Sequence, residues 1–133
     1  MKQFKKSDFS VGQTVYLRII PHSNEWRRIK DKDLKNPENH IIEATVLKIG
    51  NKYITVSITY RQLKFDVSDN FREVSEYSGN YELYLLKEDI INDIKKENMI
   101  QKIRKSFDFF SGFDFSYEQI ESVYNILFPE TEN

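Results

Sequence analysis

Cysteine is absent from this chain, which excludes disulfides and thiolate metal sites. Glycine and proline are also scarce, with four and three residues, and Ala44 is the sole alanine. No apolar run approaches the roughly 20 residues of a membrane-spanning helix. The first residues, Met-Lys-Gln-Phe-Lys-Lys, lack the apolar core of a secretion signal. We therefore expect an intracellular protein that does not enter a membrane.

Aromatic residues are abundant and make up 14% of the 133 residues, as ten Phe, eight Tyr and one Trp. With 39% hydrophobic and 31% charged residues, the composition is typical of one soluble globular domain. Charge is unevenly placed, because residues 1–40 carry nine basic against five acidic side chains, and residues 87–133 carry six against ten. A basic end can bind phosphates or an acidic protein surface, although ordinary solvated surface gives the same asymmetry.

The clearest local pattern is a β-hairpin over residues 41–58, where two β-branched runs flank Gly50 and Asn51. In the second run Ile54 and Val56 alternate with polar residues, which predicts a strand with one buried face. In the first run the apolar parity switches, which predicts a β-bulge or a strand covered on both faces. Gly50 and Asn51 readily adopt positive φ, so we expect them to form a tight turn.

Further strands are predicted by alternation over residues 15–19, 63–67 and 81–85, and residues 71–74 are expected to continue the sheet. Short strands joined by tight turns are typical of a small SH3-like barrel of about five strands. Residues 21–40 show no periodicity and predict a long loop. Residues 1–8 are basic and polar, and we expect a loosely held lead-in there.

Helical spacing of apolar residues begins at Lys87 and continues to Phe110, and Ser111-Gly112 is a typical helix end. Ser116 and Gln119 predict a capping box at the start of a second helix, which Pro129 ends. We therefore expect an α+β protein in which a five-stranded barrel over residues 1–86, with the long loop 21–40, precedes a helical hairpin over residues 87–133. The hairpin should pack on or beside the barrel.

Four stretches of the chain carry a family resemblance, namely Phe9–Leu17, Val46–Val56, Glu76–Leu85 and Phe115–Ile120. In these stretches the chain resembles a group of small SH3-like β-barrel proteins from phages and mobile elements of low-GC Gram-positive bacteria. The resemblance implies a barrel of mobile-element origin in the cytoplasm of a bacterial host cell, and it implies no reaction. Proteins of this kind include regulators, DNA-associated factors and inhibitors of host defence.

Catalytic and metal-binding patterns are weak. His22 and His40 flank the long loop, and Asp31, Asp33 or Glu38 could supply a third metal ligand, but no His-x-His or His-x3-His spacing is present. Asp31 and Asp33 stand among lysines and are better explained as a solvated charge cluster than as an acid–base pair. A Gly-rich phosphate loop and a nucleophile elbow are both missing from the sequence. We expect no enzymatic activity, no metal and no cofactor.

The basic stretch Trp26-Arg27-Arg28-Ile29-Lys30 is the sharpest candidate for binding. Its cations could neutralise phosphates while the indole stacks on a base, and the same residue types also dominate protein–protein hot spots. In the alternative, Trp26 is buried under its own loop and the arginines are only solvated. The predicted partner-binding residues are Trp26, Arg27, Arg28, Lys30, Lys32, Lys35, Lys52, Tyr53 and Lys64.

An aromatic cluster crosses the turn between the two helices and comprises Phe107, Phe109, Phe110, Phe113, Phe115 and Tyr117. It either fills the gap between the helices or, if it is exposed, marks an interface. We predict a non-catalytic binding module that contacts a host or phage protein, as an inhibitor of a host defence system of the anti-CRISPR type. The alternative is a nucleic-acid-binding accessory or regulatory protein that uses the basic loop 26–35. It takes second place because the sequence pI is only about 6.1.

Overall fold

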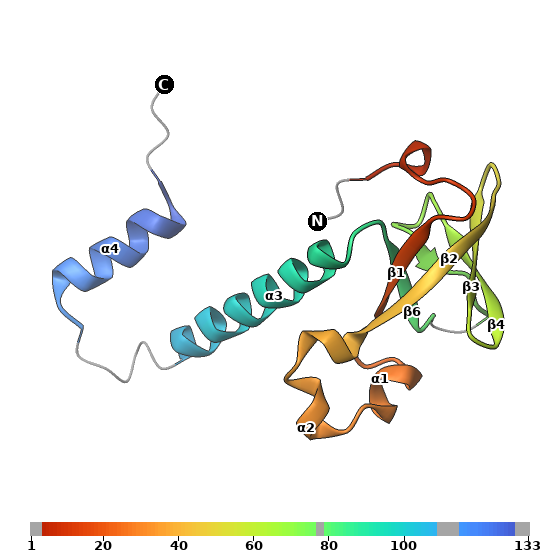
Figure 1. Cartoon of the computed structure of the whole chain (residues 1–133). Coiled ribbons are helices and arrows are strands. Elements are labelled where there is room, and N and C mark those ends of the chain that lie inside the picture. The colour runs from red at the N-terminus through yellow and green to blue at the C-terminus, as the bar shows by residue number, and fades with distance from the viewer. Residues whose placement is uncertain (1–3, 77–78, 109–114, 130–133) are drawn as a thin grey trace. The chain divides into compact units, whose positions relative to one another are not determined.

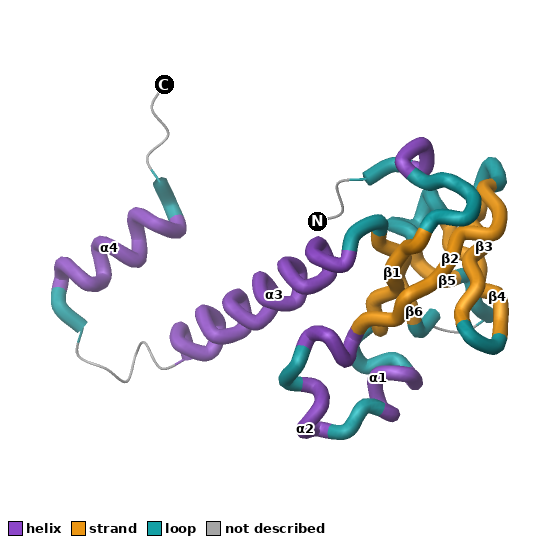
Figure 2. Tube along the Cα trace, in the orientation of Figure 1, coloured by secondary structure: helices purple, strands orange, loops and turns teal. Residues whose placement is uncertain are grey.

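The computed structural model describes residues 4–76, 79–108 and 115–129. Figure 1 shows the elements along the chain. The chain divides into two compact units, Met1–Lys95 and Lys96–Asn133. The first unit holds every strand that the structure describes, and Figure 2 separates the strands from the helices by colour.

The first unit is a closed antiparallel β-barrel in which the strands follow their order in the sequence and β6 pairs with β1. Its strands are β1 (Thr14–Ile19), β2 (Ile41–Ile49), β3 (Tyr53–Ile58), β4 (Arg61–Asp66), β5 (Arg72–Glu73) and β6 (Tyr81–Tyr84). The barrel thus has six strands where we expected five. The additional strand is β5, whose two residues pair with both β4 and β6. It follows a sharp turn in which Asn70 and Phe71 both have positive φ.

The barrel core confirms the alternation of apolar residues in the sequence. On β3 the inward side chains Ile54 and Val56 have no exposed surface, while Thr55 between them is half-buried. Val15 and Leu17 on β1 are equally buried. Burial of apolar surface at about 25 cal/mol per Å² makes these alternating residues the main stabilising contribution to the barrel.

The β2–β3 hairpin contains the predicted irregularity, because the strand register shifts between Val46 and Lys48. This β-bulge explains the parity switch, since one extra residue on β2 moves the following side chains to the other face. The turn itself differs from the prediction. Neither Gly50 nor Asn51 has positive φ, and the Gly50 N–H donates a 2.8 Å hydrogen bond to the Tyr53 carbonyl.

The N-terminal lead-in is packed rather than loosely held. After the 3₁₀ turn η1 (Lys6–Asp8), Phe9 is buried, and Phe4 before the turn is buried as well. The Phe4 ring lies 4.9 Å from that of Phe71 and 6.0 Å from that of Tyr84, measured between centroids. Aromatic burial outweighs the polar character that led us to expect a loose segment.

Residues 21–40 form short helical turns instead of an irregular loop. They contain α1 (Asn24–Arg28), α2 (Asp31–Leu34) and the 3₁₀ helix η2 (Pro37–His40). The Ser23 hydroxyl accepts a hydrogen bond from the Trp26 N–H, and Asn36 accepts one from the Glu38 N–H. These caps allow helices that are too short to show a periodic apolar pattern.

Two helices follow the barrel, α3 (Lys87–Asp108) and α4 (Tyr117–Leu127). Ile90 and Ile94 on the first turns of α3 are buried in the core of the first unit. The predicted capping box is confirmed, since Ser116 and Gln119 hydrogen-bond each other's backbone N–H groups. The predicted end of the first helix at Ser111-Gly112 lies outside the described residues. Among the residues that the structure describes, no helix combines the length and apolar character of a membrane span.

Candidate functional site

The predicted partner-binding residues fall into two groups at opposite ends of β2. The residues from Trp26 to Lys35 precede the strand, and Lys52 and Tyr53 follow it. A strand of this length spans roughly 25–30 Å. Figure 1 accordingly shows α1 and α2 at one end of the barrel and the β2–β3 turn at the other. The structure therefore does not join all nine residues into one surface.

Trp26 is anchored within its own segment. Its ring meets that of His40 edge-on, with centroids 4.7 Å apart, and His40 is only 4% exposed. The His40 Nε2 atom lies 2.7 Å from the Leu34 carbonyl oxygen, a hydrogen bond that holds the end of α2 against η2. This placement matches the alternative in which Trp26 packs under residues 21–40, and it leaves Trp26 half-buried.

Arg28 lines a groove at the barrel end that carries α1, which we call the barrel-end groove. The groove is lined by Glu25, Arg28, Ile42, Ile58, Thr59, Tyr60, Arg61 and Tyr81. Tyr60, in the two-residue turn between β3 and β4, is 95% exposed. Ile42 and Ile58 are half-buried and pack against the core, so they form an apolar floor beneath a polar rim. Four separate segments of the chain, α1, β2, the β3–β4 turn with its flanking residues, and β6, thus build one concave surface.

Charged groups organise the rim of the barrel-end groove. Arg28 Nη1 lies 3.2 Å from Glu25 Oε1, and the Glu25 N–H donates a 3.3 Å hydrogen bond to Asn80 Oδ1. Burial raises the pKa of the Tyr81 hydroxyl, the negative charge of Glu25 raises it further, and a hydrogen bond with Arg61 opposes both. Tyr81 therefore stays protonated beside Arg61 at the edge of the groove.

The other cations of this segment lie outside the groove. Arg27, Lys30, Lys32 and Lys35 are all exposed, and the groove lining includes none of them. Asp31 and Asp33 lie in the same stretch and offset part of its positive charge. The basic run of the sequence thus supplies one groove residue, Arg28, and a solvated surface around it.

The second group forms a concave patch on the outer face of β2, β3 and β4, which we call the lysine face. It joins the predicted Lys52, Tyr53 and Lys64 with Lys48, which the sequence analysis did not single out. Thr55 pairs with Lys48 on one side and Lys64 on the other, so these side chains lie in one row across three strands. Lys52 Nζ lies 5.3 Å from the Tyr53 ring centroid, a cation–π arrangement.

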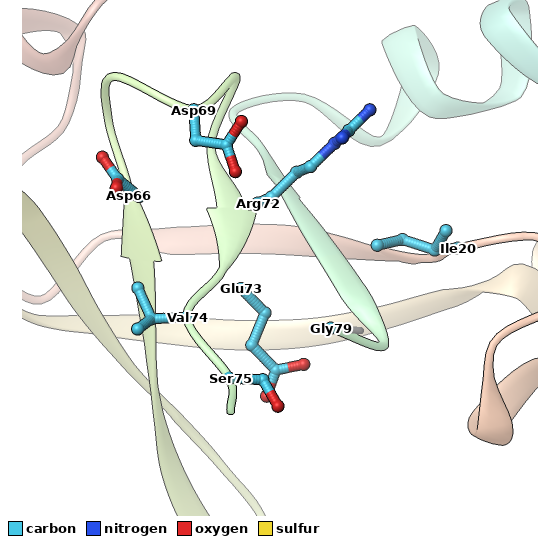
Figure 3. Close-up of a pocket in the computed structure, with 8 residues that line it drawn as sticks. All are labelled: Ile20, Asp66, Asp69, Arg72, Glu73, Val74, Ser75 and Gly79. Carbon is cyan, nitrogen blue, oxygen red and sulfur yellow. The ribbon is translucent and has the colours of Figure 1, made fainter. Parts of the chain in front are cut away.

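A third hollow, drawn in Figure 3, is lined by the acidic residues Asp66, Asp69 and Glu73 together with Arg72. Asp66 Oδ1 accepts hydrogen bonds from the Ser68 N–H at 2.9 Å and the Ser68 hydroxyl at 2.7 Å, and the hydroxyl lowers the pKa of Asp66. Glu73 Oε1 accepts one from the Asn80 N–H at 2.8 Å. Figure 3 shows the carboxylates of Asp66, Asp69 and Glu73 pointing in different directions. Within the described part of the chain, no group of His, Asp and Glu could hold a metal ion.

A family model described as the phage ProQ C-terminal-like domain matches residues 1–133, the whole of the chain. The chain belongs to this family. It is therefore a small phage-associated domain, as the resemblance implied, and its barrel is the six-stranded one described above. No curated protein and no solved structure matches the chain.

Of the groove residues in this phage domain, sequence reasoning identified only Arg28, and the most notable ones that it missed are Tyr60 and Arg61. A tyrosine in a two-residue turn is an unusual place for a large ring, because turn positions favour small polar residues. That signal was present in the sequence. The proximity of Arg28, Tyr60 and Ile42 could not be predicted from the sequence, because strand pairing brings these residues together.

Proposed function

We propose that this phage domain is a non-catalytic binding module that contacts a protein partner through the barrel-end groove. The observation that carries the proposal is Tyr60, a 95% exposed ring beside Arg28 and Arg61 above an apolar floor. Tyrosine and arginine are the residue types that concentrate binding energy at protein interfaces. The ring does not stand alone, since it lines one concave surface with two arginines and two isoleucines, and such a combination favours a partner that covers it.

The partner surface should be acidic with an apolar centre. Arg28 and Arg61 can each bind a carboxylate in a bidentate way, and the floor of Ile42 and Ile58 can receive one apolar side chain. We place the partner in the cytoplasm of the bacterial host. Within the classes open to a phage protein of this size, we favour an inhibitor of a host defence system, of the anti-CRISPR type. An inhibitor of this kind needs surface complementarity and no reaction.

The test uses three single variants in a bacterial host that carries a CRISPR–Cas system. The chain is expressed in these cells, and the plating efficiency of a targeted phage is measured. The wild-type chain should restore plating, and Tyr60→Ala should abolish the effect because it removes the ring. Arg61→Glu should do the same by reversing a rim charge. Arg27→Glu is the matched control, because Arg27 is exposed, carries the same charge and lies outside the groove.

A second readout separates the binding proposal from the defence proposal. Proteins retained by the wild-type chain from infected cells are compared with those retained by Tyr60→Ala and Arg27→Glu. A protein retained by wild type and Arg27→Glu, and lost with Tyr60→Ala, supports binding through the groove. Its identity then decides whether host defence is the target. Identical retention by all three proteins, the wild type included, would contradict the groove as the binding site.

The second candidate function is nucleic-acid binding, and the lysine face supports it better than residues 26–35 do. Lys48, Lys52 and Lys64 share one concave surface with the Tyr53 ring, an arrangement that suits phosphates and an unpaired base. Binding of a single-stranded oligonucleotide that weakens steeply with added salt would support it. Its loss in a Lys48→Glu/Lys64→Glu variant, with Arg27→Glu unaffected, would locate it on this face.

A further inference from the structure

The second unit contains two apolar stripes that are exposed. On the outer half of α3, Met99, Ile100 and Ile103 are 59%, 37% and 51% exposed. On α4, Ile120, Tyr124 and Leu127 are 46%, 59% and 47% exposed, and their i, i+4, i+7 spacing places them on one face. Among the described residues after Ile94, the structure buries no apolar side chain. The described part of this unit therefore contains no buried apolar core.

The exposed stripe of α3 lies on a different side of the helix from its buried one. Ile90 and Ile94 belong to the core of the first unit. At 100° per residue, the centre of the outer stripe is rotated by roughly 150° from the centre of the buried pair. The two stripes thus lie on nearly opposite faces of the helix.

Size and chemistry restrict what can stabilise the second unit. It runs from Lys96 to Asn133 and is shorter than the roughly 40 residues below which disulfides, metals or oligomerisation are usually needed. The chain has no cysteine, and its described part has no cluster of metal ligands. A further protein surface is needed to cover its apolar stripes.

Charge complementarity between α3 and α4 favours a second copy of this chain as the partner. Ile103 stands between Lys102 and Arg104, so cations flank the outer stripe of α3. The charged residues of α4 are Glu118 and Glu121, its sequence contains no basic residue, and Glu121 lies at the edge of its apolar stripe. A basic and an acidic apolar face complement each other.

We infer that the protein self-associates, with the outer half of α3 in one copy packing against α4 of a second copy. Two copies bring four helical segments around a common apolar core, which a single pair of short helices cannot build. The contact is independent of the barrel-end groove. The domain would thus present two grooves, one on each barrel.

The first experiment measures the mass of the full chain in solution over a wide concentration range. The wild-type chain should show twice its 16.0 kDa mass and fall to a monomer on dilution. Ile103→Asp should remain monomeric, because it places a charge in the apolar contact. Gln101→Asp is the matched control, since it makes the same addition of negative charge on the side of α3 that carries Ile90 and Ile94. Both variants should retain the thermal unfolding of the barrel.

A charge-exchange experiment identifies the partner as a second copy. One variant carries Lys102→Glu and Arg104→Glu, and the other carries Glu118→Lys and Glu121→Lys. Each alone should self-associate at least about tenfold more weakly at low salt, because like charges then face each other. Mixed in equal amounts they should recover the double mass. A wild-type chain that stays monomeric, or a mixture that stays monomeric, overturns the inference.

Discussion

The hydroxyl of Tyr84 donates a 2.7 Å hydrogen bond to Oδ2 of Asp93. Tyr84 ends β6 and Asp93 lies on the first turns of α3, so this bond fastens the helix to the barrel. Burial of Tyr84 and its bond to Asp93 raise the pKa of the hydroxyl well above its usual value, and a hydrogen bond with Arg18 opposes them. Burial would raise the pKa of Asp93, but the Tyr84 bond and the charge of Arg18 hold it below its usual range.

Removal of this hydroxyl should destabilise the barrel. We expect Tyr84→Phe to lower the free energy of unfolding by about 1.5–3 kcal/mol, since the lost bond is made to a charged group. Urea denaturation measures the change. Tyr16→Phe is the control, because Tyr16 pairs with Tyr84 across the sheet and its hydroxyl makes no hydrogen bond within the described residues. Equal losses in the two variants would contradict a special role for the Tyr84–Asp93 bond.

The same bond predicts a pH dependence in two directions. The folded pKa of Asp93 lies below the ordinary 3.8, so its contribution is present above pH 3.8 and is lost as the pH falls through the folded pKa. The folded pKa of Tyr84 lies above the ordinary 10.0, so its contribution is present below pH 10.0 and is lost as the pH rises. The stability difference between wild type and Tyr84→Phe should therefore be largest between these values. A difference that stays constant from acid to alkali would contradict the assignment.

The central hairpin should dominate the stability of the barrel. Val56 has no exposed surface, so Val56→Ala should cost about 1–3 kcal/mol through lost transfer energy and a partial cavity. Thr55→Ala on the outer face should cost much less, because Thr55 is half-buried beside the lysine face. Chemical denaturation of both variants checks the inward face of β3.

Gly79 should tolerate no side chain. A Cβ atom at Gly79 would lie 2.8 Å from the backbone oxygen of Glu73, closer than van der Waals contact allows. We expect Gly79→Ala to lower the free energy of unfolding by about 1–3 kcal/mol, because the backbone must shift. The matched change Gly50→Ala meets the Tyr53 oxygen at 3.2 Å and should cost less. Thermal unfolding of the two variants would show the order, and the reverse order would refute the steric argument.

Local patterns predicted most of the barrel, because alternation along one strand depends only on neighbouring residues. The buried Ile54 and Val56, the bulge near Val46 and the cap at Ser116 all belong to this class. Elements of only a few residues were not predicted, because helices as short as α1 and α2 contain too few residues to show a repeating apolar pattern. Phe4 was missed because its burial depends on Phe71, which is far away in the sequence.

The candidate site was less predictable than the fold. Arg28 was identified from the basic run Trp26–Lys30, but its neighbours Ile42 and Tyr60 come from other segments. Their meeting depends on the register of β2, β3 and β4, which no pattern within one segment contains. Trp26 was chosen for its chemistry, and its edge-on packing on His40 could not be read from the run of basic residues.

Because β5 has only two residues, the strand pairing between β4 and β6 is weaker than the pairing elsewhere in the barrel. The ladder from β4 to β6 runs through Arg72 and Glu73, with supporting hydrogen bonds at Phe71 and Val74. Transient opening of this short seam would expose the unpaired backbone edges of β4 and β6, which can accept a strand from another molecule. On heating, aggregation should therefore begin by strand addition at these two edges, while the long β2–β3 hairpin is still intact.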